Sequence, residues 1–262
     1  PYEVIVVDDA STEDISRKVS EFGKLPISLI RRPERGGAAA ARNTGILAAK
    51  GEFVGFLDSD DQWTPDKLEN QLTYHAANSD ISLSCTGYIF FRMDGRESKV
   101  IYEAKDYGLP DLAFGCSLSP GSTLLVKRSV FDEVGVFDES LPRLEDWDWL
   151  IRAVQVSRIG LVPEILATIQ QTGFASHDSV ETAVQLIENR HRKRFADYSE
   201  KANRQFRAAL ANEMSVASFR HRSFLKAFIW LLRSLVIYPF RQPGYYLRVL
   251  SGALRTFAGR SA

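Results

Sequence analysis

Three carboxylates within four residues, Asp58, Asp60 and Asp61, follow a short apolar run at residues 53–57. The run has the length and the aromatic and β-branched content of a buried strand. Ionised carboxylates are costly in an apolar interior, so we expect the strand to end in a polar crevice of the kind that binds ligands in open α/β sheets. Carboxylates this close repel one another unless a cation lies among them, and such ligands suit Mg²⁺ or Mn²⁺. A solvated surface turn is the alternative interpretation.

A second pair of acids, Asp8 and Asp9, ends the apolar run at residues 4–7. A continuous apolar, β-branched run predicts a strand that is covered on both faces. A helix at residues 15–22, capped by the hydroxyl residues before it, and a further strand at residues 25–30 are predicted next. Strand, helix and strand at this spacing indicate a βαβ unit of a parallel sheet.

A basic loop at residues 31–37 ends in Gly36 and Gly37 and precedes an alanine-rich helix, which carries Arg42 and stops at Gly51. A glycine loop before a helix N-terminus is a plausible contact for a phosphate or a nucleotide. A plain turn is the commoner meaning of two glycines. The loop has neither a Walker lysine pattern nor a dinucleotide fingerprint.

Glu145 and Asp146 fall in the first turn of a predicted helix, whose apolar face carries Trp147 and Ile151. The helix dipole favours negative charge in this turn, so ordinary helix-terminus chemistry could explain both acids without any catalytic role.

The patterns between these groups predict the rest of a mixed sheet. A helix carrying Leu68 and Leu72 is expected after Pro65, and a hairpin turn is expected at Gly95. Small polar residues at 117–123 could form a floor that approaches a ligand closely, or an ordinary loop that enters a strand. The predicted strands lie at residues 81–91, 100–102, 124–126 and 162–169.

Composition limits the class of protein. The chain has 262 residues, with 45% hydrophobic residues, 33 basic residues and 33 acidic residues. These values are typical of one large globular domain with an appendage, and the balanced charge argues against a protein that binds nucleic acid by bulk electrostatics. The two cysteines, Cys85 and Cys116, have neither metal-like spacing nor enough neighbours for a disulfide framework, which indicates a reducing compartment such as the cytoplasm.

The character of the chain changes beyond residue 175, where helical patterns rich in Arg, Ala and Glu begin. Basic residues within the apolar helix at 221–240 fit a segment that lies at a membrane interface better than one that spans the bilayer. Helices that pack on the main domain or on a partner subunit are the alternative. A second aromatic and basic stretch follows at residues 245–257. We therefore expect a main domain at residues 1–175 and a helical region at residues 176–262.

Several of these stretches occur together in an order that resembles glycosyltransferase family 2, over roughly residues 2–170. The resemblance implies the GT-A fold, which is a Rossmann-like mixed, mainly parallel sheet flanked by helices. It also implies a nucleotide-sugar donor, a divalent cation (Mg²⁺ or Mn²⁺) and transfer with inversion at the anomeric carbon. The motifs that carry it are VVDDAS at 6–11, ARNTG at 41–45, AKGE at 49–52, LDSDD at 57–61, VGVFDE at 134–139 and EDW at 145–147.

The resemblance assigns roles on the donor side of the site. Asp8 and Asp9 match the acids that recognise the nucleotide base, with Asp9 the better match. Arg42 matches an arginine that borders the nucleotide and braces the acidic motif. Asp58 and Asp60 match the two acids of the family's Asp-x-Asp metal motif.

The resemblance also assigns the cation and the base. Asp60 or its neighbour Asp61 is expected nearest the cation, and Asp146 matches the catalytic base, with Glu145 beside it. His177 matches loosely a segment that contacts the diphosphate or the metal in some members, although a surface histidine is the alternative.

The family normally opens with an earlier strand and a Pro-Thr-Tyr-Asn loop, whereas this sequence begins at Pro1 without an initiating Met. We therefore expect a fragment that lacks its natural beginning. The predicted function is transfer of a sugar, most simply from a UDP-sugar, to a hydroxyl of a glycan or lipid-linked acceptor in bacterial surface polysaccharide synthesis. The predicted location is the inner face of the cytoplasmic membrane. The alternatives are a phosphohydrolase with Asp58 as nucleophile and an inert nucleotide-sugar-binding subunit.

Overall fold

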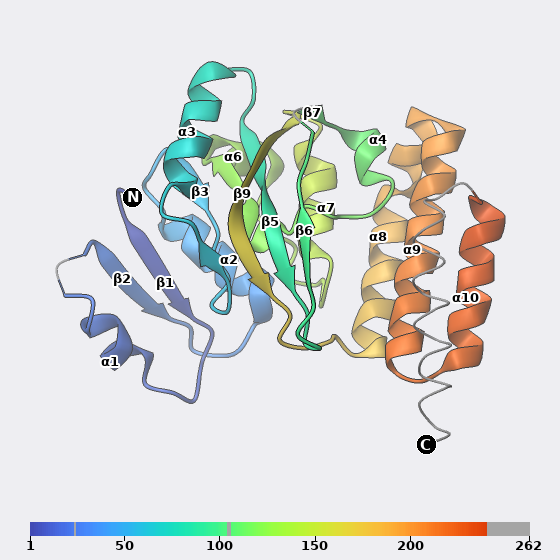
Figure 1. The fold of residues 1–262 in the computed structure, drawn as a ribbon, viewed down its shortest axis with the longest axis horizontal. Coiled ribbons are helices and arrows are strands. Elements are labelled where there is room, and N and C mark those ends of the chain that lie inside the picture. Colours follow the sequence, from blue (N-terminus) through green and yellow to red (C-terminus); the bar gives the residue numbers. More distant parts are fainter. Residues whose placement is uncertain (24, 104–105, 240–262) are drawn as a thin grey trace. The chain divides into compact units, whose positions relative to one another are not determined.

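The structure, a computed structural model, describes residues 1–23, 25–103 and 106–239 (Figure 1). The chain divides into two compact units. The first unit contains residues 1–109 and 116–173, and the second contains residues 110–115 and those from 174 onward.

The first unit is built on a seven-stranded mixed sheet with the order β3-β8-β5-β9-β4, in which β6 pairs with β5 and β7 pairs with β9. The long strands β5 and β9 are parallel, and the other pairs in this sheet are antiparallel. The mixed sheet is confirmed, but the expectation that it is mainly parallel is wrong for the described strands. The strands predicted at residues 81–91, 100–102 and 162–169 correspond to β5, β6 and β9. The bounds are β3 (Phe53–Gly55), β4 (Gln62–Trp63), β5 (Leu83–Phe91), β6 (Glu97–Val100), β7 (Asp106–Tyr107), β8 (Leu125–Lys127) and β9 (Ile159–Gln170).

A separate two-stranded parallel sheet holds β1 (Val4–Asp8) and β2 (Ile27–Arg31), joined through α1 (Ile15–Ser20). The predicted strand–helix–strand order is therefore confirmed. The side chains of β1 are half-buried before Asp8, not covered on both faces, because β1 pairs with β2 alone among the described strands. The cap of α1 is Asp14, which accepts hydrogen bonds from two amides of the first turn, so the expected hydroxyl cap is wrong.

Helices cover both sheets of this unit (Figure 1). Helix α2 packs on β1, α3 packs on β5 and β9, and α6 packs on β8 and α7. Four aromatic rings contact one another, those of Phe131 in α6, Trp149 in α7, Phe56 and Phe137. The bounds are α2 (Gly37–Ala48), α3 (Lys67–Ala77), α5 (Pro120–Thr123), α6 (Ser129–Val134) and α7 (Glu145–Ala153). The short helix α4 (Leu109–Leu112) lies mostly in the second unit.

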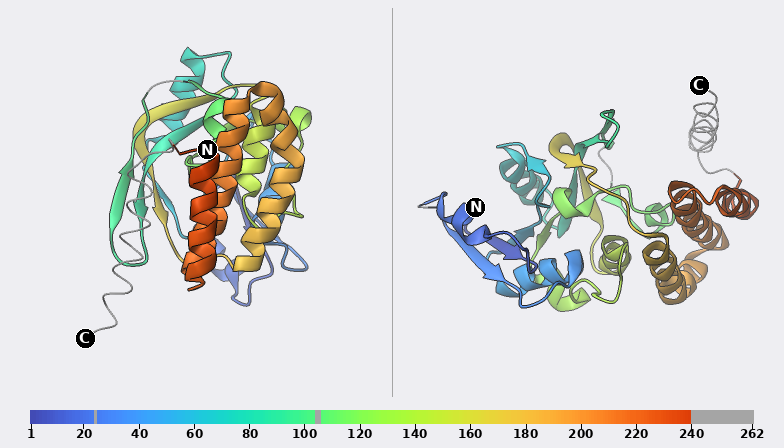
Figure 2. Two further views of the ribbon diagram at one scale, coloured as in Figure 1. Left: turned by 90° about the vertical axis from the view of Figure 1, so that its right-hand side faces the viewer. Right: turned by 90° about the horizontal axis from the view of Figure 1, so that it is seen from below.

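The second unit contains three long helices that run side by side, α8 (His177–Tyr198), α9 (Glu200–Arg220) and α10 (Phe224–Ile237) (Figure 2). Ser176 and Ser199 cap α8 and α9 by accepting a backbone N–H through their side chains. Within the part of the chain that is described, no helix is both long enough and apolar enough to cross a membrane. The aromatic and basic stretch at residues 245–257 lies outside the described residues.

Helix α3 follows Pro65 as expected, and the face that it buries is polar. Leu72 is 44% exposed, whereas Lys67, Gln71 and His75 are buried. The Lys67 ammonium donates to Gln71 Oε1 at 2.6 Å and lies 4.1 Å from the centroid of the Trp63 ring. This polar face is stable because its groups bond one another and the neighbouring strands, and a cation over an indole face is itself attractive. Burial lowers the pKa of Lys67 to about 7.

We predict that replacing Lys67 with Met removes a pH dependence of stability. The unfolded chain holds the Lys67 proton up to its ordinary pKa of about 10.4, whereas the folded chain releases it near pH 7. The unfolded state therefore binds more protons between these values, and the wild-type free energy of unfolding should rise by up to about 1.4 kcal/mol per pH unit from this residue.

Urea unfolding at pH 7 and pH 9 measures this effect, with Lys50→Met as the matched control because Lys50 is exposed. The rise should vanish in Lys67→Met and persist in the control. The same rise in both variants would show that Lys67 is not the group responsible.

Candidate active site

Arg42 joins two acidic segments that are distant in the sequence. Its Nη2 donates to the two carboxylate oxygens of Asp58 at 2.7 and 3.0 Å, and its Nη1 donates to Glu145 Oε1 at 2.8 Å. The Arg42 side chain is only 13% exposed. One guanidinium from α2 therefore brings the acidic loop after β3 together with the first turn of α7, as a planar group with five donors can do.

The residue beside Arg42 fixes its helix against the turn before α7. Asn43 Nδ2 donates to the Phe137 carbonyl at 2.9 Å, and the Phe137 N–H donates to Asn43 Oδ1 at 2.9 Å. The Phe137 ring lies 5.9 Å from the Arg42 guanidinium carbon. Asn43 belongs to the ARNTG motif, but its role could not be predicted from the sequence, because its partner is 94 positions away.

The three acids after β3 have different surroundings. Asp60 is exposed, and its Oδ2 accepts from Thr172 Oγ1 at 2.7 Å. Asp61 accepts from Ser122 Oγ at 2.6 Å and from the Gln170 N–H at 2.8 Å. Burial raises the pKa of Asp61, although both hydrogen bonds oppose this rise. β3 ends at Gly55, which leaves the acids in a loop.

Helix α5 approaches this loop closely. A Cβ atom at Gly121 would lie 2.5 Å from Asp58 Oδ2 and 2.7 Å from Arg42 Nη2, so only glycine fits there without a shift. The Ser122 carbonyl accepts from Trp63 Nε1 at 2.6 Å, which ties α5 to β4. The sequence placed both residues in a segment that is either a ligand floor or an ordinary loop, and their small size was the available signal.

Asp146 follows Glu145 in the first turn of α7 and is half-buried. Burial and the adjacent Glu145 carboxylate raise the pKa of Asp146, and the Arg42 guanidinium opposes the rise. A carboxylate with a raised pKa is better matched to taking a proton near neutral pH than an ordinary aspartate.

Asp9 holds the glycine loop. Its carboxylate accepts from the N–H groups of Gly36 at 2.9 Å and Gly37 at 2.7 Å, and from Arg32 Nε at 2.8 Å. Burial alone would raise the pKa of Asp9, but these hydrogen-bond donors outweigh burial and lower it. The two amides considered for a phosphate contact therefore bind a carboxylate of the chain itself. Recognition of a nucleotide base by Asp9 or by the buried Asp8 stays a prediction.

His177 lies in the second unit, in the first turn of α8. Its Nδ1 is 3.8 Å from a carboxylate oxygen of Asp178 and 3.8 Å from one of Glu181, and its Nε2 is 3.2 Å from Ser218 Oγ. His177, Asp178 and Glu181 offer possible metal-ligand atoms within 4.8 Å of one another. Among the described residues, these partners of His177 belong to its own unit, and a contact of His177 with a diphosphate or a metal stays a prediction.

Comparison with known proteins shows the family. The family described as Glycosyl transferase family 2 matches residues 1–135, which is 135 of the 262 residues. The putative teichuronic acid biosynthesis glycosyltransferase TuaG of Bacillus subtilis is 41% identical over 96 residues, which cover 36% of this chain and 38% of TuaG. An uncharacterized glycosyltransferase of Rickettsia typhi is 32% identical over 176 residues, which cover 63% of this chain and 53% of that protein. The chain thus spans about half or less of the length of these relatives.

A glycosyltransferase of Escherichia coli also matches. It is the UDP-Glc:alpha-D-GlcNAc-diphosphoundecaprenol beta-1,3-glucosyltransferase WfgD, 42% identical over 78 residues, which cover 30% of this chain and 31% of WfgD.

Among solved structures, S. aureus TarS 1-349 in complex with UDP-GlcNAc superposes with a TM-score of 0.59 at 18% identity, covering 91% of this chain and 84% of that one. GalNAc-T7 with UDP, GalNAc and Mn²⁺ gives a TM-score of 0.55 at 16% identity, covering 90% and 50%. Because both identities are low, these similarities show the fold alone, and they confirm the predicted GT-A fold class. The family match over more than half of the chain shows the family: the chain belongs to glycosyltransferase family 2.

Proposed function

We propose that the chain transfers a sugar from a nucleotide-diphosphate sugar, a UDP-sugar, to a hydroxyl of a glycan or lipid-linked acceptor, with inversion at the anomeric carbon. The observation that carries this proposal is the Arg42 bridge, which joins an exposed acidic loop to a turn that contains a carboxylate of raised pKa. Such a pairing supplies a cation site and a proton acceptor, which are the two functions that this transfer needs.

The names of similar proteins support the classes of donor and acceptor. WfgD is named for UDP-Glc and a diphosphoundecaprenol acceptor, TuaG for teichuronic acid biosynthesis, and TarS was solved with UDP-GlcNAc. We extend these classes to the present chain as bacterial surface polysaccharide synthesis on a lipid-linked or glycan acceptor.

Asp146 is the proposed base. An acceptor hydroxyl is a weak nucleophile, so a carboxylate within hydrogen-bond reach must take its proton as the new bond forms. Glu145 is held by Arg42 at 2.8 Å, which fixes the turn that presents Asp146. Inversion needs one base, on the face of the sugar opposite the leaving group.

The acidic loop offers hard oxygen ligands of the kind that Mg²⁺ and Mn²⁺ prefer. The candidate ligands in this loop are Asp60 and Asp61, with Asp58 beside the diphosphate. His177 belongs to the second unit and stays a separate candidate for a diphosphate or metal contact. Asp60 fits, because it is exposed and one of its oxygens accepts no hydrogen bond within the described residues. A bound cation would stabilise the charge of the nucleoside diphosphate leaving group as a Lewis acid.

We predict that Asp146→Asn keeps the UDP affinity of the wild type while sugar transfer falls by roughly 10²-fold or more, because only the proton acceptor is lost. Titration with UDP and Mn²⁺ measures the affinity, and release of UDP from a panel of UDP-sugars with an acceptor measures transfer. Asp132→Asn is the matched control, because Asp132 is exposed on α6.

Normal turnover in Asp146→Asn would show that Asp146 has no catalytic role and is explained by the helix dipole, which favours negative charge in the first turn. Hydrolysis of phosphomonoesters that is lost in Asp58→Asn, with no release of UDP by the wild type, would favour the phosphohydrolase instead. Binding of UDP without any transfer would favour an inert binding subunit.

We also propose that α10 places the protein at the inner face of the cytoplasmic membrane. Its exposed large apolar residues recur at helical spacing and form one stripe, which consists of Leu225, Phe228, Ile229, Leu232 and Val236. The basic residues Lys226 and Arg233 lie along one edge of this stripe by the same spacing, and both are exposed. An apolar stripe with a basic edge suits a surface of anionic lipid.

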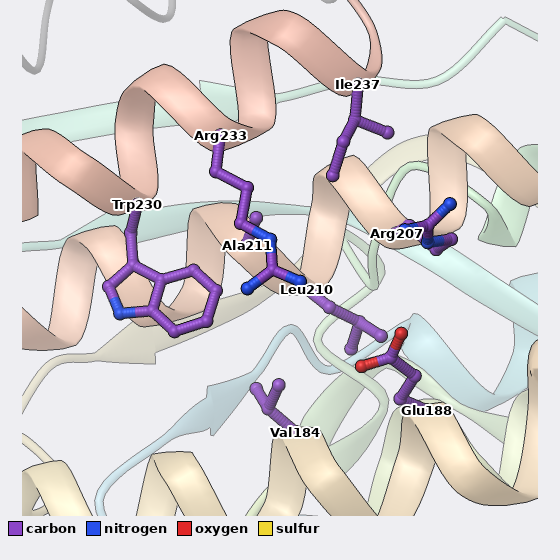
Figure 3. A pocket seen from close by; sticks show the side chains of 8 residues that line it. All are labelled: Val184, Glu188, Arg207, Leu210, Ala211, Trp230, Arg233 and Ile237. Atoms are coloured by element: carbon purple, nitrogen blue, oxygen red, sulfur yellow. The ribbon is translucent and has the colours of Figure 1, made fainter.

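The neighbouring side of α10 lines a small hollow among the three helices of this unit (Figure 3). The Arg233 guanidinium lies 4.9 Å from the centroid of the Trp230 ring there, and Arg207 of α9 adds a second cation. Trp and Arg at one rim fit contact with lipid headgroups, since the indole ring has an apolar body and a polar N–H.

For this surface we predict that Leu225→Gln with Leu232→Gln lowers binding to vesicles of phosphatidylglycerol and phosphatidylcholine by at least about tenfold, since each leucine loses apolar burial. Co-sedimentation measures the bound fraction. The control is Leu47→Gln with Leu72→Gln, which changes two exposed leucines of the first unit and should leave binding unaltered. Equal binding by both double variants would defeat the assignment of α10.

A further inference from the structure

We propose that Asp61 and Ser122 are positioning residues that fix the acidic loop, and that Asp61 is not a ligand of the cation. This inference rests on the proposed cation site and deepens it, because it decides which acids of the loop remain available. Both carboxylate oxygens of Asp61 have a partner within the fold, Oδ2 with Ser122 Oγ at 2.6 Å and Oδ1 with the Gln170 N–H at 2.8 Å.

Ser122 uses its hydroxyl in two directions. The hydroxyl donates to Asp61 and accepts from the Asp58 N–H at 3.0 Å, which agrees with one donor and two acceptor sites on a hydroxyl. The Asp61 N–H also donates to the Asp58 carbonyl at 3.0 Å. The two ends of the loop are therefore fastened to each other and to one buried serine, which is 1% exposed.

The loop is also fastened to two other elements. Gln170 is the last residue of β9, and its N–H reaches Asp61 across the end of the strand pair β4–β9. The Trp63 indole N–H donates to the Ser122 carbonyl at 2.6 Å, so that α5 is tied to β4 as well. Turning Asp61 toward a cation would break its bonds to a buried hydroxyl and to a strand amide, and unsatisfied polar groups of this kind are costly.

Asp60 has the opposite surroundings. It is exposed, and its one hydrogen bond among the described residues comes from the exposed hydroxyl of Thr172 at 2.7 Å. The bond from Thr172 uses Asp60 Oδ2, so the other carboxylate oxygen can accept a cation while this bond stays intact. Asp60 is therefore the proposed cation ligand, whereas Asp61 and Ser122 form the brace, the pair that holds the loop in place.

The test measures Mn²⁺ affinity on the whole chain in the presence of UDP, by the electron paramagnetic resonance signal of free Mn²⁺. We expect Asp60→Asn to weaken Mn²⁺ binding by about 100-fold or more, and Asp61→Asn by less than about fivefold, because asparagine can still accept from the Gln170 amide. Ser122→Ala should weaken binding by about tenfold, which is typical of groups that orient a metal ligand.

A second measurement reports on the brace without any metal. Hydrogen exchange of the amides of residues 58–63 should accelerate by about tenfold or more in Ser122→Ala, and not in Asp60→Asn. Ser84→Ala is the matched control, because Ser84 is a buried serine that bonds Gln71 and His75 instead of the loop.

Equal losses of Mn²⁺ affinity in Asp60→Asn and Asp61→Asn would overturn the inference, and so would unchanged exchange in Ser122→Ala. A wild-type chain that binds no Mn²⁺ with UDP would count against the proposed cation site. The exchange measurement would then still decide whether Ser122 holds the loop.

Discussion

The contact between Arg42 and two carboxylates is the interaction on which the rest of the site depends. Asp58 and Glu145 come from segments that share no sheet pairing, and one guanidinium holds both at hydrogen-bond distance. A point charge such as an ammonium could neutralise these acids but could not present separate donors to each in a fixed plane. The arginine is largely buried, so its removal would leave the Glu145 carboxylate, which is only 15% exposed, without its cationic partner.

Much of the surrounding fold serves to place this one side chain. Asn43 fastens α2 to the turn before α7, and the aromatic cluster around Phe137 lies beneath the guanidinium. Gly121 lets α5 approach within a distance that no side chain would allow. The result is a fixed junction between an acidic loop that can face a cation and a turn that can take a proton, as electrostatic preorganisation requires.

The sequence alone predicted the elements whose hydrophobic period is clear, such as β5, β9 and the three long helices, and it located the acids at the ends of strands. It did not predict the polar buried face of α3, because Leu68 and Leu72 formed the more obvious helical pattern and the partners of Gln71 are backbone carbonyls of other segments. Local pattern carries no information about such long-range satisfaction of polar groups.

The candidate site likewise contains some residues that the sequence predicted and others that it did not. The ordered motifs identified Arg42, the acidic loop and the acids in the first turn of α7, and Arg42 joins the two acidic segments in the structure. The role of Ser122 in holding the loop could not be predicted, since Ser122 bonds Asp61 across 61 positions and resembles any small loop residue in the sequence. The hydrogen bonds from two glycine amides to Asp9 could not be predicted either, because such amides bind a phosphate and a carboxylate equally well.

The most direct test of the Arg42 bridge compares Arg42→Lys and Arg42→Gln with the wild type, for UDP affinity in Mn²⁺ and for sugar transfer. We expect both variants to lose transfer by roughly 10²-fold or more, without rescue by lysine, because one ammonium cannot hold Asp58 and Glu145 together in the required plane. Near-normal transfer by Arg42→Lys would contradict the claim that this bridge assembles the site.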